Sequence, residues 1–108
     1  MKDKTIKLKM NNIVLGTLSF EDNKYVFCGN EEGFRLAKTK TPIIPFVLNE
    51  SGKTEYIKLP YPFSKFLVLA SREDVKEQLN ILDTDTDFDI LVKYASSDIE
   101  PETFYISI

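Results

Sequence analysis

Carboxylates are the main groups in this chain that could carry chemistry. There are 17 Asp and Glu residues, no histidine and a single cysteine, Cys28. Without histidine the chain lacks the commonest general base, the commonest zinc ligand and the partner of Ser–His and Cys–His nucleophile pairs. One thiol excludes an intramolecular disulfide and a multi-thiolate metal site. We therefore expect a non-catalytic protein without cofactor or metal, with Cys28 as a small apolar filler in the core.

The densest group of carboxylates is the run from Asp83 to Asp89, in which acids occupy alternate positions. A calcium loop starting at Asp83 needs glycine at its sixth position and glutamate at its twelfth, but these are Phe88 and Tyr94. Acidic residues at the start of a helix complement its dipole and cap its first turn. We expect this run to begin a helix at Thr84 or Thr86.

A second candidate is the aromatic segment from Leu59 to Ala70, which contains Pro60 and Pro62. In one interpretation its phenylalanine rings complete the core. In the other the segment contacts a partner protein, because aromatic side chains give a large contact area at low entropic cost and proline pre-orders a loop. Tyr61 is the best candidate for the solvated rim of such an interface, because its hydroxyl can remain in contact with water. The predicted partner-binding residues are Tyr61, Phe63, Lys65 and Phe66.

The charge distribution argues against a free-standing nucleic-acid binder. Residues 1–70 hold 11 Lys and Arg against 7 Asp and Glu, whereas residues 71–108 hold 3 against 10, and the pI is about 5.0. Lys2, Lys4, Lys7 and Lys9 are expected on the outer face of an edge strand. No apolar run approaches the ~20 residues of a membrane span, and the start lacks a signal-peptide core, so we expect a cytoplasmic protein.

The hydrophobic pattern predicts strands first and helices afterwards, in a single domain over residues 1–108. Runs of strands followed by helices indicate an α+β fold. We expect a small antiparallel sheet or partly closed barrel of about five to six strands, with two helices from the C-terminal half packed on it. The expected strands are 5–10, 13–20 with a bulge at Gly16, 25–28, a hairpin of 43–48 with 54–59, and 103–108. Tight turns are expected at Asn11-Asn12 and 21–24, a short helical turn at 34–37, and helices starting at Ser71 and at Thr84 or Thr86.

Several short motifs follow one another in an order that is known from one family. They are Met10-Asn11-Asn12 with Gly16-Thr17-Leu18, residues 22–27, Leu59-Pro60-Tyr61-Pro62-Phe63, residues 71–75, and residues 87–91 followed by Glu102-Thr103-Phe104. In order and spacing they resemble the N-terminal domain of HipA-type kinases, the toxins of bacterial toxin–antitoxin pairs. The resemblance spans most of the chain. In many bacteria this domain is encoded separately, as a HipS-like small protein.

The resemblance implies a regulatory, antitoxin-like subunit that binds a separately encoded HipA- or HipT-like Ser/Thr kinase and either inhibits or completes it. The kinase chemistry would lie in that other chain. A HipB-like DNA-binding protein would join the same complex, so that any contact with DNA is indirect. From the residues alone, the alternative is a stand-alone protein-binding or phage-type inhibitor domain that acts on an unrelated partner.

Overall fold

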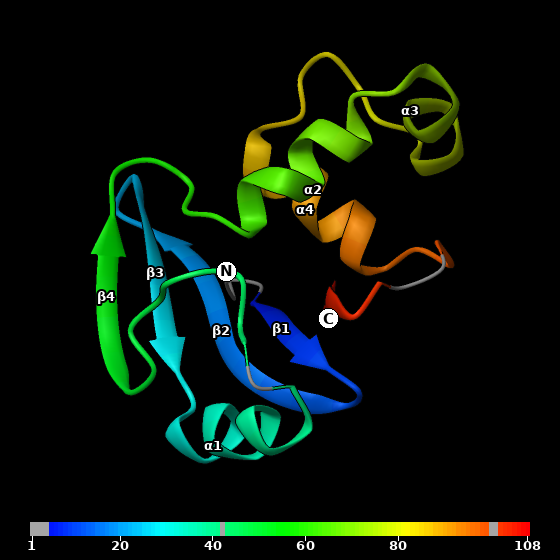
Figure 1. The fold of residues 1–108 in the computed structure, drawn as a ribbon. Helices are drawn as coiled ribbons and strands as arrows, with labels where there is room; N and C mark the ends of the chain where they lie inside the picture. The colour runs from blue at the N-terminus through cyan, green and yellow to red at the C-terminus, as the bar shows by residue number, and fades with distance from the viewer. Residues whose placement is uncertain (1–4, 42, 100–101) are drawn as a thin grey trace.

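The computed structural model describes residues 5–41, 43–99 and 102–108, and its fold is α+β as expected (Figure 1). The strands form one open antiparallel sheet, and the helices of the C-terminal half follow in sequence before the last strand returns to it. In chain order the elements are β1 (Ile6–Met10), β2 (Ile13–Glu21), β3 (Lys24–Gly29), α1 (Glu31–Lys40), β4 (Gly52–Tyr56), α2 (Phe63–Ala70), α3 (Glu73–Leu79), α4 (Asp87–Ala95) and β5 (Phe104–Ser107).

The strand order in the sheet is β4-β3-β2-β1-β5. Strand β1 therefore lies between β2 and β5, and the expectation that it is an edge strand is wrong. Lys7 and Lys9 are half-exposed, and the residues that alternate with them, Ile6, Leu8 and Met10, are buried. The edges of the sheet are β4 and β5. Lys2 and Lys4 lie outside the described residues.

The first three strands form the expected meander, which is joined by two tight turns. Asn11 and Asn12 have φ angles of 48° and 68°, and Asp22 and Asn23 have φ angles of 51° and 63°. Positive φ at both central residues is the conformation that two-residue hairpins favour, and Asn and Asp tolerate it better than other non-glycine residues. These side chains therefore fix the register of β1, β2 and β3 locally.

A bulge interrupts the pairing of β1 with β2 near Gly16, as expected. Leu8 pairs with Gly16 and Lys9 pairs with Val14, which leaves Leu15 as the extra residue. The Leu15 side chain is fully buried, and its carbonyl oxygen accepts a 2.8 Å hydrogen bond from the amide of Asn30. The bulge thus connects the sheet to the start of α1.

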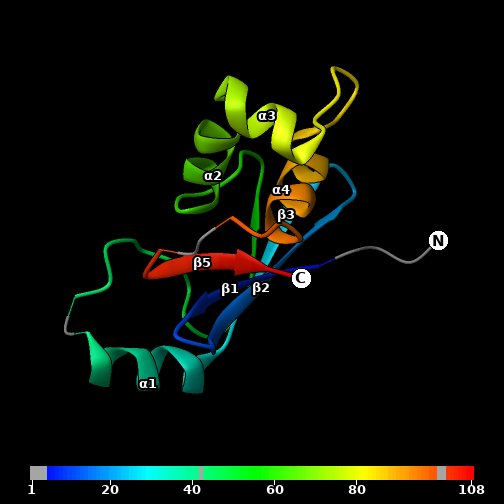
Figure 2. The same cartoon turned by 90° about the vertical axis from the view of Figure 1, so that its right-hand side faces the viewer.

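Helix α1 is longer than the predicted helical turn at 34–37. Its N-cap is Asn30, whose side chain accepts a 3.0 Å hydrogen bond from the Gly33 amide, and Glu31 and Glu32 occupy the first turn. Phe34 and Ala37 are buried against the sheet. Figure 1 and Figure 2 show α1 at one end of the molecule and α2, α3 and α4 at the other.

The expected hairpin of 43–48 with 54–59 is wrong. Residues 43–48 form no strand, and β4 pairs with β3 instead, with Thr54 opposite Phe27. The segment still alternates, because Ile44, Phe46 and Leu48 pack on the core whereas Ile43 and Val47 are 75% and 96% exposed. Its apolar pattern reflects packing on the core without sheet pairing.

The C-terminal half contains three helices within the described residues, one more than expected. The additional helix is α2, which directly follows Pro62. Helix α3 is the helix predicted to start at Ser71, and it begins at Glu73 with Arg72 as its N-cap. The capping box expected between Ser71 and Asp74 is wrong, because no side chain caps this helix. Its last residue is Leu79, and its C-cap, Asn80, is left-handed with a φ of 56°. The sequence also predicts Val75, Leu79 and Leu82 on one apolar face of this helix, but Leu82 lies beyond its last residue.

Helix α4 begins as predicted from the acidic run. Thr86 and Asp89 form a capping box, with both hydrogen bonds at 3.1 Å. Leu91 is fully buried, and β5 then pairs with β1. The core thereby joins the sheet to α1 at one end of the molecule and to α2 and α4 at the other. The buried hydrophobic cluster comprises Ile6, Leu8, Met10, Leu15, Leu18, Tyr25, Phe27, Phe34, Ala37, Leu48, Phe63, Phe66, Leu91 and Ile106.

Candidate protein-binding surface

The aromatic segment from Leu59 to Ala70 includes the whole of α2. Its three rings, Tyr61, Phe63 and Phe66, have different surroundings. Tyr61 is 52% exposed, whereas Phe63 and Phe66 are 0% and 2% exposed. The Phe63 ring lies 5.9 Å from that of Phe27, between centroids. For the two phenylalanines the core interpretation is confirmed. The prediction that Phe63 and Phe66 contact a partner is corrected, because both side chains are buried in the core and are not accessible to another molecule.

Helical periodicity explains this division. Phe63, Phe66 and Ala70 recur at a spacing of three and four residues, and all three are buried. The opposite side of the helix carries Val68, which is 69% exposed. Tyr61 comes before the first helical residue, where the chain still runs over the surface. Of the four predicted residues, Tyr61 and Lys65 can therefore reach another molecule.

Lys65 forms an ion pair with Glu102, which precedes β5. Its side chain is 37% exposed and lies 6.0 Å from the centroid of the Phe66 ring. The pKa of Lys65 is raised, mainly by the hydrogen bond to Glu102, while burial opposes this shift in part. Tyr61 and Tyr94 contribute smaller increases in this pKa. Lys65 is therefore a charged group at the surface with an internal counter-ion.

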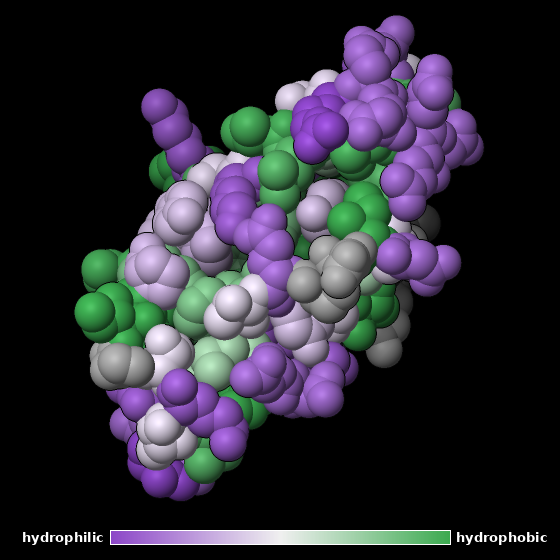
Figure 3. Space-filling view, turned by 45° about the vertical axis from the view of Figure 1, so that its right-hand side comes forward, coloured by the Kyte–Doolittle hydropathy of each residue, from purple (hydrophilic) through white to green (hydrophobic). Residues whose placement is uncertain are grey.

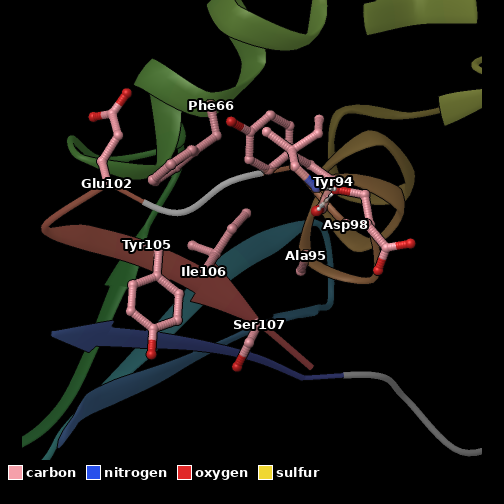
Figure 4. Close-up of a pocket in the computed structure, with 10 residues that line it drawn as sticks. Phe66, Tyr94, Ala95, Asp98, Glu102, Tyr105, Ile106 and Ser107 are labelled. Atoms are coloured by element: carbon pink, nitrogen blue, oxygen red, sulfur yellow. Dashed lines mark hydrogen bonds between the residues drawn. The ribbon is translucent and has the colours of Figure 1, made fainter. Parts of the chain in front are cut away.

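A cavity of about 300 Å³ opens beside this ion pair, between α2, α4 and β5. Figure 4 shows the Phe66 and Tyr94 rings side by side, with Ile106 pointing toward them from β5. The two rings lie 5.3 Å apart. Burial, followed by the charge of Glu102, raises the pKa of Tyr94, while the charge of Lys65 opposes this shift in part. The cavity thus has an apolar wall and an acidic margin.

Spacing along the chain gave no sign of this arrangement. Lys65 and Glu102 are 37 positions apart, and Tyr94 belongs to the helix between them. Only the return of β5 to β1 brings Glu102 under α2. The order of the elements could have suggested their proximity, but not which side chains would meet.

Cys28 is exposed, so its prediction as a buried filler is wrong. Its neighbour Phe27 points into the core and is fully buried. Because side chains alternate along a strand, the two residues must face opposite sides of the sheet. Cys28 pairs with Thr17 and Lys53, on the face of the sheet opposite to Phe27.

The acidic run before α4 does not assemble a metal site. Within residues 5–41, 43–99 and 102–108, no group of three or more potential ligands could hold a metal ion. Asp85 instead accepts hydrogen bonds from the Leu82 amide at 2.9 Å and from Lys93 at 2.6 Å. These contacts lower the pKa of Asp85, with the backbone hydrogen bond as the largest cause.

The surface as a whole mixes polar and apolar side chains. Figure 3 shows hydrophilic side chains gathered over α3 at the upper right, with hydrophobic ones interspersed over the rest of this face. None of the helices in the described part of the chain has both the length and the apolar character to cross a bilayer. Comparisons with family models, curated proteins and solved structures found no match to the chain.

Proposed function

We propose that this chain is a non-catalytic, antitoxin-like subunit that binds a separately encoded HipA- or HipT-like Ser/Thr kinase and controls its activity. The observation that carries the proposal is the half-exposed ring of Tyr61, held between prolines at the start of a core helix. The order of the sequence motifs supports the choice of partner. The fold expected from that resemblance, a small antiparallel sheet with helices packed on it, is also the fold observed.

Tyr61 has the properties of an interface anchor. Its neighbours Pro62 and Phe63 are buried, so the backbone that carries the ring is already ordered before binding. Anchors of this kind cost little additional entropy on association, and truncating one typically weakens binding by about 1–3 kcal/mol. Lys65, four positions after Tyr61, adds a positive charge, and a carboxylate on the partner would compete with Glu102 for it.

The complex that we propose is cytoplasmic and includes a HipB-like DNA-binding protein. Phosphoryl transfer belongs to the kinase chain, and DNA binding belongs to the HipB-like chain. The present chain binds no nucleic acid directly in this scheme. Its pI of about 5.0 supports that division, because direct nucleic-acid binders usually concentrate positive charge.

The proposal predicts that a HipA-like catalytic chain is encoded next to this one, and it is tested by co-expressing the two chains. We expect the two to co-purify, and growth arrest by the kinase to change when this chain is present. Tyr61→Ala should raise the Kd of the complex about 5- to 150-fold, as loss of one anchor predicts. Leu36→Ala is the matched control, because Leu36 is 39% exposed on α1, at the other end of the molecule.

Growth arrest that is the same with and without this chain, and no co-purification, would contradict the proposal. A pull-down that then captures an unrelated protein in a Tyr61-dependent manner would favour the stand-alone inhibitor. Equal weakening by Tyr61→Ala and Leu36→Ala would show that Tyr61 is not the anchor.

A further inference from the structure

A second surface, remote in sequence from Tyr61, is a groove between α2, α3 and the residues that precede α4. Its volume is about 320 Å³. Ala70 is buried at its base, and three half-buried side chains, Leu67, Ile81 and Ile90, provide the rest of an apolar floor. A concave apolar surface of this size is at the lower end of the range in which proteins hold a ligand or an anchoring side chain.

The margin of the groove is acidic. Asp83, Asp85 and Asp87 line it, and Lys76 is the cation among its lining residues. Asp85 is engaged by Lys93 and is only 11% exposed. Asp83 and Asp87 are exposed and form no ion pair within the described residues, so they present two carboxylates to solvent beside the apolar floor.

The chain that carries these acids is held in place before any ligand arrives. Asp85 and Leu82 exchange two hydrogen bonds, of 2.9 Å and 3.0 Å. Lys93 reaches from α4 to the Asn80 carbonyl oxygen at 2.8 Å, which ties the end of α3 to α4. A ligand can therefore bind without first ordering this segment, which reduces the entropic cost of association.

The apolar lining of the groove reaches the molecular surface, because Leu82 lines the groove and is 53% exposed. The chemistry that complements this surface is an apolar side chain for the floor and positive charge for the margin. The excess of acids in residues 71–108, 10 against 3 Lys and Arg, favours the same sign of partner over a longer distance.

We propose that this groove, defined by Leu67, Ala70, Ile81, Ile90, Asp83 and Asp87, docks a basic amphipathic segment of a partner protein. One apolar side chain of that segment occupies the floor, and Lys or Arg residues beside it contact Asp83 and Asp87. The proposal does not depend on the kinase assignment, because it involves neither Tyr61 nor Lys65. It adds a second binding surface with its own partner chemistry.

The probe is a fluorescein-labelled helical peptide with Leu on one face and Lys on the other, titrated with the full chain and followed by anisotropy. Two further peptides replace Leu by Ser or Lys by Glu. Binding of the Leu/Lys peptide should shift the amide NMR signals of residues 81–90. The double variant Asp83→Asn/Asp87→Asn should raise its Kd about three- to tenfold, as expected for two partly exposed ion pairs.

The matched control is Glu73→Gln/Asp74→Asn, which removes the same charge from α3 outside the groove. It should leave the Kd within about twofold, because these two carboxylates do not line the groove and salt screens charges that are exposed to solvent. Ser71→Trp places a bulky ring at the exposed margin of the groove and should abolish binding while circular dichroism stays unchanged. Tyr61→Ala should leave the peptide Kd unaltered, which separates this test from that of the proposed function.

Three results would overturn the proposal. The Ser/Lys or Leu/Glu peptide could bind as tightly as the Leu/Lys peptide. The control pair could weaken binding as much as Asp83→Asn/Asp87→Asn does. The peptide could fail to bind at millimolar concentration, or could shift amide signals only outside the groove.

Discussion

Two aromatic residues that are two positions apart in the chain have opposite roles. Phe63 is fully buried against Phe27, and Tyr61 is 52% exposed. Phe63→Ala should lower the free energy of unfolding by about 3–5 kcal/mol, because it leaves a cavity in the core. Tyr61→Ala should change it by less than about 0.5 kcal/mol, as substitutions at the surface usually do. Urea denaturation followed by circular dichroism measures both, and equal losses would mean that Tyr61 is also structural.

The carboxylate of Asp85 predicts a dependence of stability on pH. Its pKa is lowered in the folded chain, first by the Leu82 amide and then by Lys93. A depressed pKa means that the stabilising contribution is present above the unfolded value of 3.8 and is lost as the pH falls through the folded pKa. Asp85→Asn should therefore lower the Tm at about pH 6.5, and the difference should shrink toward about pH 2.5.

Thermal melts at several pH values test this, with Asp83→Asn as the control. Asp83 lies in the same run but is exposed, and it forms no ion pair within the described part of the chain. Its substitution should leave the Tm nearly constant across the series. A Tm difference for Asp85→Asn that persists undiminished at the lowest pH would show that packing, rather than ionisation, accounts for the effect.

At the scale of elements, the contact of α1 with β2 depends on Gly33. A Cβ atom at this position would lie 1.9 Å from the carbonyl oxygen of Val14. On an exposed helix, alanine would be more stable than glycine by about 1 kcal/mol. Here the close approach reverses the sign, and Gly33→Ala should destabilise the fold by about 1–3 kcal/mol, as overpacking does. Thr39→Ala, on the exposed side of the same helix, should be neutral or slightly stabilising in the same urea titration.

Residues 29–41 are mostly polar, so the sequence predicts only a short helical turn at 34–37 where the structure has α1. A glycine in the first turn lowers the intrinsic helix propensity, and the compensating contact with Val14 cannot be read from local sequence. The alternation of residues 43–48 predicts a strand, but it comes from packing on the core without sheet pairing. By contrast, the turn at Asn11-Asn12 and the capping box at Thr86 were predictable, since their chemistry lies within a few residues.

The same distinction applies to the candidate surface. Tyr61 could be singled out because proline and tyrosine at adjacent positions are a local signal. Phe63 and Phe66 could not be assigned to core or surface from composition, because the answer depends on which side of α2 faces the sheet. The Lys65–Glu102 ion pair required the return of β5 to β1, which is a property of the topology.

At the scale of the whole molecule, one hydrophobic cluster joins elements that lie at opposite ends. Phe34 of α1 and Leu91 of α4 both belong to it, and the strands connect them. Strand β1 is central to this connection, because it pairs with β2 and β5 and contacts α4. The two ends of the molecule should therefore not unfold independently.

We expect a single cooperative transition, in which far-ultraviolet circular dichroism and tyrosine fluorescence give the same urea midpoint. Phe34→Ala and Leu91→Ala should each move both signals to lower urea together, because each opens a cavity in the shared core. Leu36→Ala should leave both midpoints nearly unchanged, since Leu36 lies outside the cluster and is 39% exposed. If Phe34→Ala shifts the helical signal while the tyrosine signal keeps its midpoint, α1 unfolds separately, and the core does not unite the two ends.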